Sequence, residues 1–315
     1  MVTTPSTTDH TPVVWLLADN RPGHRRQLQG LGNRLKVLAG ADVHWLDVNR
    51  YPVPLWRALT GLAPRWPQTP PAPDLVIGAG HQTHRALLAL RRRCRTVVLM
   101  KPSFPLSLVD AAIIPEHDGV RPAAHRLITE GVLHPITPMA RLTDKPQALM
   151  LIGGPSRHVR WQDEDVLAQA RQLIDAHPRW HWTISNSRRT PEELTQRLQA
   201  LPGPRVTVVD HSQTHDQWVS HTLAASRAVW VTPDSVSMVC EAVTSGVPTG
   251  VLDVPLSPGS RLAHGIDQLL ARERIVGLDQ QSRIFSPPSG QTSVRSPLWE
   301  ADRAARWLIK RGLGP

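Results

Sequence analysis

Short apolar runs alternate with amphipathic segments along most of the chain. In the first half, aliphatic and β-branched residues cluster in runs that predict strands at residues 13–17, 43–46, 75–77, 96–100 and 111–114. Helical periodicity lies between these runs, at residues 25–38 and 84–92. Strands that alternate with helices are typical of βαβ units, so the first half is predicted to form a parallel sheet.

A second series of the same kind follows an irregular, proline-containing stretch at residues 131–146, which predicts a domain boundary. Strands are expected at residues 148–152, 180–184, 205–209, 228–232 and 249–252, and helices at 163–176, 191–200 and 235–245. Thr190 is placed to cap the helix that starts at Pro191, with Glu193 completing a capping box.

The pattern therefore predicts an α/β protein with two Rossmann-like domains, at residues 1–140 and 146–290, joined so that a cleft lies between their parallel sheets. A final amphipathic helix is expected within residues 297–312. Its apolar stripe holds Leu298, Ala301, Ala305 and Leu308. The proline-rich stretch 51–73 carries one short amphipathic segment and is interpreted as a surface excursion that contacts a partner.

Composition narrows the function classes. No apolar run of the 315 residues approaches the roughly 20 that a membrane helix needs. Residues 1–12 lack a basic region and an apolar stretch, so they do not resemble a signal peptide, and a cytoplasmic protein is expected. Cys94 and Cys240 are expected to be reduced.

The formal net charge of +10 favours anionic partners. All but four of the 36 basic residues are arginine, a bias that a GC-rich genome also produces without any functional cause. The arginines are dispersed and no helix-turn-helix or RNA-recognition signature accompanies them, so nucleic acid is not the predicted partner.

The loops after strands are the places to search for chemistry, because ligands of open α/β sheets bind outside the carboxyl ends of the strands. The first such loop contains Asp19, Gly23 and His24. An imidazole there is suited to general-base catalysis at neutral pH, although His24 is equally well explained as a packing residue at a helix start.

The second loop contains Gly80, His81, Thr83 and His84. It matches only part of a dinucleotide-binding fingerprint, which disfavours NAD. His81 and His84 lack a nearby third metal ligand, so the open alternatives are polar contacts to a substrate and a solvated loop.

The third loop, Gly153, Gly154, Ser156 and Arg157, follows the first strand of the second domain. Consecutive glycines expose backbone N–H groups, which cradle phosphate at the end of a strand. The next strand ends at the segment 185–190, which adds the Ser185 hydroxyl and the guanidinium groups of Arg188 and Arg189. These residues together predict an anion site.

The fourth loop opens the helix at 235–245 with Asp234 and Ser235, and Glu241 lies on the same helical face as Asp234. A phosphate at this helix N-terminus would meet free N–H groups and the helix dipole, and Glu241 would accept hydrogen bonds from a ribose diol. The alternative is a capped helix with a solvated Glu241.

Two tempting metal motifs are better explained structurally. The acidic run Asp163, Glu164 and Asp165 opens a helix, where acidic residues complement the dipole. His211 and His215 have the spacing of a zinc motif but lack its glutamate. No metal and no cofactor is predicted.

The segments DNRPGHRRQLQGL, PEHDGV, LIGGPSRH, SNSRRTPEEL and VTPDSVSMVCEA together resemble the mitochondrial fission ELM family, across roughly residues 13–270. That family in turn is similar to GT-B glycosyltransferases of the MurG type. The resemblance implies that Gly23 and His24 match the glycine-rich loop of the first domain and that Gly153, Gly154 and Ser156 match the phosphate loop of the donor domain. It further implies that residues 235–241 match the helix whose glutamate binds ribose, and that the final helix packs on the first domain.

The resemblance thus implies a metal-independent glycosyltransferase that moves a sugar from a nucleotide-diphosphate sugar, most simply a UDP-sugar, to a glycan or lipid-linked acceptor of the cell envelope. The expected donor-binding residues are Gly153, Gly154, Ser156, Arg157, Ser185, Arg188, Asp234, Ser235 and Glu241. His24 or Asp19 is the expected base, with Gly23, Gly80, His81 and Thr83 on the acceptor side. The alternatives are a nucleotide-sugar 2-epimerase of the same fold and a non-enzymatic adaptor in which Trp56 and Trp66 dock on an anionic inner-membrane surface.

Overall fold

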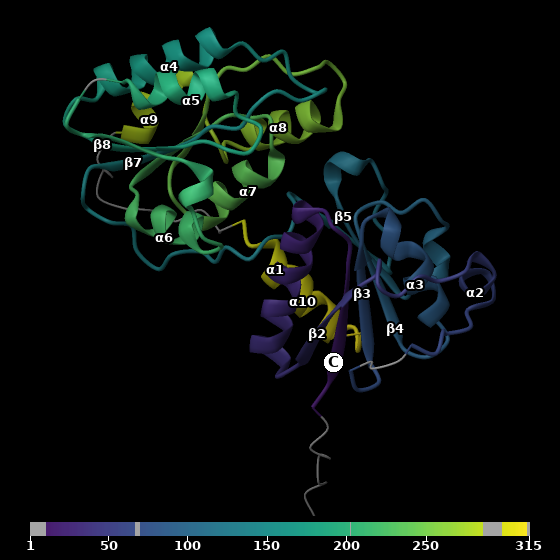
Figure 1. Ribbon diagram of the computed structural model, residues 1–315. Helices are drawn as coiled ribbons and strands as arrows, with labels where there is room; N and C mark the ends of the chain where they lie inside the picture. Colours follow the sequence, from purple (N-terminus) through teal and green to yellow (C-terminus); the bar gives the residue numbers. More distant parts are fainter. Residues whose placement is uncertain (1–10, 67–69, 202, 286–297, 314–315) are drawn as a thin grey trace, which may run out of the picture. The chain divides into compact units, whose positions relative to one another are not determined.

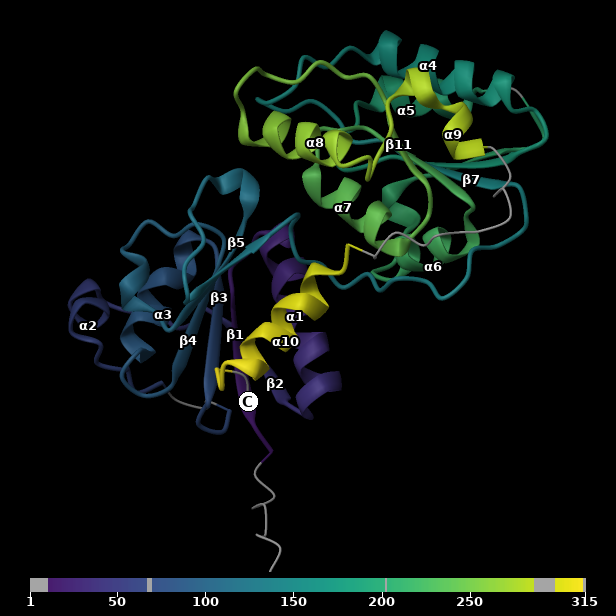
Figure 2. The ribbon, with the colours of Figure 1, turned by 180° about the vertical axis from the view of Figure 1, so that it is seen from behind.

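The computed structural model describes residues 11–66, 70–201, 203–285 and 298–313. The chain divides into two units: unit 1 comprises Met1–Pro135 with Glu300–Pro315, and unit 2 comprises Ile136–Trp299. Each unit is a parallel sheet with helices on both faces (Figures 1 and 2). No helix within the described ranges is long and apolar enough to cross a membrane.

Unit 1 contains a six-stranded sheet in the order β2-β1-β3-β4-β5-β6, in which every neighbouring pair is parallel. Its strands are β1 (Val13–Ala18), β2 (Asp42–Asp47), β3 (Leu75–Ala79), β4 (Arg95–Leu99), β5 (Ala111–Pro115) and β6 (Arg126–Thr129). Its α-helices are α1 (Pro22–Ala39), α2 (Leu55–Thr60), α3 (His84–Leu90) and α10 (Glu300–Lys310). Single turns of 3₁₀ helix are η1 (His81–Thr83), η2 (Leu106–Leu108) and η3 (Glu116–Asp118).

The four inner strands of unit 1, β1, β3, β4 and β5, are buried on both faces, as expected for a parallel sheet covered by helices, whereas the edge strands β2 and β6 are partly exposed. The α2 and α3 helices cover one face, where Trp15 and Leu17 join the core, and α1 and α10 lie side by side on the other (Figures 1 and 2). Helix α10 is held to α1 by its apolar stripe and by an ion pair of 2.6 Å between Arg34 and Asp302.

Unit 2 contains a five-stranded parallel sheet in the order β11-β10-β7-β8-β9. Its strands are β7 (Gln147–Leu151), β8 (His181–Ser185), β9 (Val206–Val209), β10 (Ala228–Val231) and β11 (Thr249–Val251). Its α-helices are α4 (Asp163–Ala176), α5 (Glu192–Gln199), α6 (Trp218–Ala225), α7 (Val236–Ser245), α8 (Arg261–Ala271) and α9 (Ser282–Phe285), with 3₁₀ turns η4 (His211–Gln213) and η5 (Leu278–Gln280).

Helices α4 and α5 cover one face of the unit 2 sheet and α6 and α7 cover the other (Figure 1). The buried indoles of Trp182 and Trp230 fill the core on the α4 side. Gly250 on β11 has no room for a side chain, because a Cβ there would lie 2.5 Å from the Trp230 ring.

The predicted α/β class and the two parallel sheets are confirmed. Each predicted strand and helix is present with ends that agree within about two residues, except that α1 begins three residues earlier and α10 three residues later than predicted. The apolar stripe of the last helix is buried as expected, although α10 begins at Glu300 and residue 297 lies outside the described residues. The pattern missed β6, α6, α8 and the short α9.

Two local interpretations were wrong. Thr190 does not cap α5, which begins after Pro191. The Thr190 hydroxyl instead accepts a hydrogen bond from the Ser187 N–H at 2.8 Å and donates one to the carbonyl of Gly153. The stretch 51–73 is more than a surface excursion, because Val53 and Ala58 are buried and Val53 belongs to the core of unit 1.

Candidate functional site

Each sheet has one place where the strand order reverses direction. In unit 1 this switch point lies between β1 and β3, and in unit 2 it lies between β7 and β10. The connections that leave the two strands go to opposite faces of the sheet, which opens a crevice at their carboxyl ends. The predicted loops that contain Asp19, Gly80, Gly153 and Asp234 all lie at these two points.

A buried carboxylate orients a histidine at the switch point of unit 1. Asp19 directly follows β1, and its side chain is 2% exposed. One carboxylate oxygen accepts the Arg21 N–H at 3.0 Å, and the other lies 2.8 Å from Nδ1 of His24 in the first turn of α1. A carboxylate that accepts Nδ1–H fixes the tautomer in which Nε2 carries the lone pair, so Nε2 of His24 is presented as a base.

Gly80 brings the loop after β3 against this pair. It adopts φ +87° and ψ 158°, a region that residues with side chains essentially do not enter. A Cβ on Gly80 would lie 2.2 Å from Nδ1 of His24 and 2.8 Å from a carboxylate oxygen of Asp19. The buried Thr83 hydroxyl donates to the Gly80 carbonyl at 2.8 Å and holds the loop in place.

Two further histidines follow Gly80. The rings of His81 and His84 are 5.2 Å apart, and Nδ1 of His84 lies 3.2 Å from the Ser103 hydroxyl. Burial lowers the pKa of His84 from 6.5 to about 4, with smaller contributions from His81 and His24. His84 is therefore neutral at pH 7, and the alternative of a fully solvated loop is wrong for this residue.

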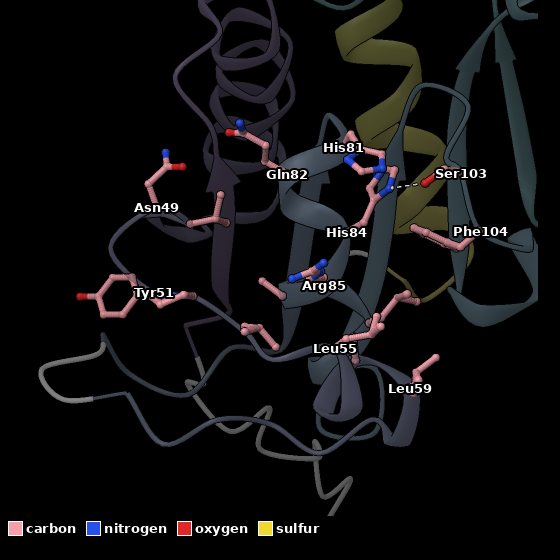
Figure 3. A pocket seen from close by; sticks show the side chains of 16 residues that line it. Asn49, Tyr51, Leu55, Leu59, His81, Gln82, His84, Arg85, Ser103 and Phe104 are labelled. Carbon is pink, nitrogen blue, oxygen red and sulfur yellow. Dashed lines mark hydrogen bonds between the residues drawn. The ribbon is translucent and has the colours of Figure 1, made fainter.

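A pocket of about 570 Å³ adjoins the histidines (Figure 3). Its walls come from the segment after β2, from α2, from η1 with the start of α3, and from the loop after β4. Leu55 and Leu59 lie at one end of the view and His81 with His84 at the other, with Arg85 between them. Its volume is typical of sites for small molecules.

The switch point of unit 2 is closed by a second buried carboxylate, Asp234. The Gly153 N–H donates to the Thr232 hydroxyl at 2.7 Å, and the Gly154 N–H donates to Asp234 at 3.3 Å. The Thr232 hydroxyl in turn donates to Asp234 at 2.6 Å. A Cβ on Gly153 would lie 2.1 Å from the Asp234 carboxylate, so only glycine allows this approach.

Arg189 completes the network and carries its charge to the surface. Its guanidinium group forms an ion pair with Asp234 and donates to the Gly154 carbonyl at 3.4 Å. The Asp234 side chain is fully buried, whereas that of Arg189 is 41% exposed. A guanidinium that is anchored on one side by a buried carboxylate is pre-oriented to meet a second anion on its open side.

Helix α7 starts beside this network. Ser235 occupies its N-cap position without a side-chain hydrogen bond, and Ser235 to Met238 are half-buried. Glu241 lies two turns into the helix and is only 5% exposed, so the alternative of a solvated glutamate is wrong. Free N–H groups at the start of a helix favour an anion there.

The remaining predicted residues lie in the same loops, but in the described part of the chain none of them bonds to Asp19 or Asp234. Ser156 is half-buried, Arg157 and Arg188 are exposed, and Ser185 is buried, with its hydroxyl 3.3 Å from the Asn186 carbonyl. Gly23 lies in the first turn of α1, where a Cβ would contact nothing within 4 Å. No neighbouring atom of the described residues therefore requires a glycine at position 23.

Sequence reasoning named Arg189 together with Arg188 in the predicted anion site and left His84 between a substrate contact and a solvated loop, and it did not name Thr232 or Ser103 as functional residues. Arg188 and Arg189 are indistinguishable by residue type and loop position, so the pattern offered no signal between them. The burial of His84 could have been anticipated, because it follows a strand and begins a helix with apolar residues at 86, 87, 89 and 90. Within the described ranges, no three His, Cys, Asp or Glu side chains are grouped to hold a metal ion.

The contact between Gly80 and the Asp19–His24 pair predicts a large stability loss for Gly80→Ala. We expect the free energy of unfolding to fall by about 3 kcal/mol, because the new Cβ adds a clash to backbone strain. Gly119→Ala is the matched control: Gly119 also has positive φ in unit 1 but its Cβ would meet nothing within 4 Å. Its loss should be about 1 kcal/mol. Equal losses in urea titrations would contradict the packing described.

The lowered pKa of His84 predicts a dependence of stability on pH. The unfolded chain takes up a proton near pH 6.5 that the folded chain accepts only near pH 4. Stability contributed by neutral His84 is thus full above pH 6.5 and is lost as the pH falls toward 4. Between pH 7.5 and pH 5, wild type should lose about 1–2 kcal/mol more than His84→Gln. The exposed His181→Gln should behave like wild type, and identical pH profiles for all three proteins would exclude this role for His84.

Comparison with known proteins places the fold. UDP-GlcNAc 2-epimerase from Neisseria meningitidis bound to UDP-GlcNAc superimposes with a TM-score of 0.59 at 10% identity, over 97% of this chain and 100% of that one. MurG of Acinetobacter baumannii superimposes with a TM-score of 0.52 at 14% identity, over 94% of this chain and 95% of that one. The expected GT-B fold is confirmed by these similarities, which at such identities concern the fold alone.

Sequence comparison gives the family. Uncharacterized protein RP120 of Rickettsia prowazekii (strain Madrid E) is 22% identical over 361 aligned residues, which cover 95% of this chain and 98% of that protein. The family model described as mitochondrial fission ELM1 matches residues 22–312. The chain therefore belongs to the mitochondrial fission ELM1 family.

Proposed function

We propose that the protein is a metal-independent glycosyltransferase that moves a sugar from a nucleotide-diphosphate sugar to a glycan or lipid-linked acceptor of the cell envelope. A UDP-linked donor is the simplest choice, because one of the similar structures contains UDP-GlcNAc. The proposal rests on a GT-B fold with an anion-binding arrangement at the switch point of unit 2 and an oriented base at the switch point of unit 1.

Unit 2 is the proposed donor domain. The diphosphate would lie at the N-terminus of α7, beside the glycine loop, where the open side of Arg189 and the Ser235 hydroxyl face it. Arg189 thereby joins the predicted donor residues Ser156 and Arg188. The N–H groups of Gly153 and Gly154 donate to Thr232 and Asp234, so the predicted phosphate cradle of that loop is replaced by the N–H groups at the start of α7. These groups and the guanidinium groups would offset the charge that develops on the departing diphosphate. Glu241 on α7 would accept hydrogen bonds from the ribose.

Unit 1 is the proposed source of the base. Nε2 of His24 would take the proton of the acceptor hydroxyl. At the same time the hydroxyl oxygen would form a bond to the anomeric carbon of the sugar, and the bond from that carbon to the diphosphate would break. Asp19 is too deeply buried to be the base itself, and its place is to hold the imidazole and to stabilise the imidazolium that forms.

The pocket beside the histidines favours transfer over the alternatives. A transferase needs room for an acceptor next to its base, whereas a 2-epimerase acts on one substrate. The pocket is lined by His81, whose neighbour Gly80 contacts His24. The epimerase remains the second candidate, because an epimerase is among the similar folds. For either enzyme, the transferase or the epimerase, we also propose that the protein attaches to the cytoplasmic face of an anionic membrane.

Donor binding is tested by titrating UDP into the protein in buffer with EDTA, followed by calorimetry. Glu241→Gln should weaken UDP binding by about tenfold or more, because the amide replaces a charged acceptor for two hydroxyl donors. Glu164→Gln is the matched control, an exposed glutamate on α4. UDP affinity that is unchanged in Glu241→Gln would refute the assignment of the ribose site.

Catalysis is tested with UDP-GlcNAc and water as a poor acceptor, by measuring UDP release. His24→Gln should lower kcat by about 10²-fold to 10⁴-fold, and Asp19→Asn should also lower it by freeing the wrong tautomer. Both variants should keep the UDP affinity of wild type, since their residues belong to unit 1. Full activity of His24→Gln would remove the proposed base.

The same reaction run in D₂O separates the two candidate enzymes. Deuterium at C2 of the recovered UDP-GlcNAc, without loss of UDP, would establish the epimerase and overturn the transferase. UDP release with no deuterium at C2 is the result we expect.

A further inference from the structure

The α2 wall of the pocket in unit 1 is unusually apolar for a surface. Leu55 and Leu59 line the pocket, yet these side chains remain 55% and 68% exposed. Trp56 and Leu62, in the same segment, are also about half exposed. Large apolar side chains gathered on one short element mark a binding surface rather than the scatter that any protein shows. Val53 and Phe104 extend the apolar lining inward.

From the middle of the pocket to the histidines the lining is polar and carries positive charge. Arg85 at the start of α3 is exposed and lines the pocket, and its guanidinium group makes no hydrogen bond or ion pair with any described residue. His81, Gln82 and Asn49 add N–H donors to the lining, and His81 and Gln82 lie on the side of Arg85 away from Leu55 and Leu59 (Figure 3). None of the sixteen lining residues is acidic. An unopposed guanidinium with neighbouring donors is complementary to a phosphate or carboxylate.

We propose that this pocket binds an anionic amphiphile, a molecule with a hydrocarbon chain and a single phosphate or carboxylate headgroup. The chain would lie along Leu55, Leu59 and Phe104, which removes their exposed surface from water. The headgroup would lie at Arg85 and His81. His81 directly follows Gly80, which packs against the proposed base His24. The headgroup would therefore lie at the end of the pocket nearest that base.

This inference deepens the proposed function where it identifies the acceptor as an acidic lipid-like molecule that also carries the hydroxyl group to be glycosylated. Only the assignment of this molecule as the acceptor rests on the proposed function. Binding of the amphiphile to the pocket needs neither a sugar donor nor turnover.

The direct test is calorimetric titration with soluble amphiphiles below their micelle concentrations. Dodecyl phosphate and laurate should bind, and each shortening of the alkyl chain by two carbons should weaken binding about tenfold. Inorganic phosphate should show no binding, and dodecyl maltoside, which has the same chain with a neutral head, should bind at least tenfold more weakly. Affinity that is independent of chain length, or equal for the neutral and anionic heads, would overturn the proposal.

Two exposed substitutions test the two ends of the pocket. Arg85→Gln should weaken dodecyl phosphate about tenfold and leave dodecyl maltoside unchanged, and Arg160→Gln, at an exposed arginine of unit 2, should change neither. Leu59→Ser should weaken both ligands about tenfold, whereas Val37→Ser, at an equally exposed site on α1, should not. Because all four side chains are at the surface, the variants are expected to fold. An effect of the two controls equal to that of the pocket variants would contradict the assignment.

Phosphatidylglycerol vesicles distinguish a lipid in a bilayer from a free amphiphile. Binding to vesicles without binding to monomeric dodecyl phosphate would show a membrane-docking surface instead of a ligand pocket, and would overturn the inference. Failure of the proposed function is recognised separately. Dodecyl phosphate binding without any UDP release would support the pocket and refute the transferase, and the reverse pattern would refute the pocket alone.

Discussion

A buried carboxylate facing a residue without a side chain is the constraint on which both halves of the molecule depend. Asp19 faces Gly80 in unit 1, and Asp234 faces Gly153 in unit 2. In each unit the carboxylate follows one strand of the switch point and the glycine follows the other. A side chain at either glycine would push the two loops apart and open the crevice in which a ligand of such a sheet binds.

The two carboxylates share a position but differ in what they hold, and this difference separates the proposed roles of the units. Asp19 holds an imidazole whose second nitrogen is left for proton transfer. Asp234 holds a guanidinium whose outer side is left for an anion. In both cases the acid is buried and the basic group is partly exposed, so the acid contributes orientation and the basic group contributes the chemistry.

Pattern and resemblance were sufficient for the architecture and for the loops, but insufficient for the contacts. The strands were predictable because a parallel sheet that is covered on both faces produces apolar runs such as VVWLLA, which any reading of hydrophobicity detects. The short edge strand β6, with its half-buried pattern, and α6, whose apolar residues are not gathered on one helical face, produce no such signal. That Arg189, rather than Arg188, joins Asp234 depends on side-chain direction in a loop, which no periodicity encodes. The pocket escaped prediction for the same reason, because its walls are joined by the sheet and not by the sequence.

The central claim is that each switch point is a separate functional centre, with the nucleotide on unit 2 alone. Hydrogen exchange of backbone amides, measured with and without saturating UDP, tests it most directly. The account predicts slower exchange in residues 153–158 and 232–241 and no change in residues 80–85. Protection of the loop at 80–85, or no protection in either segment of unit 2 while UDP is bound, would contradict it.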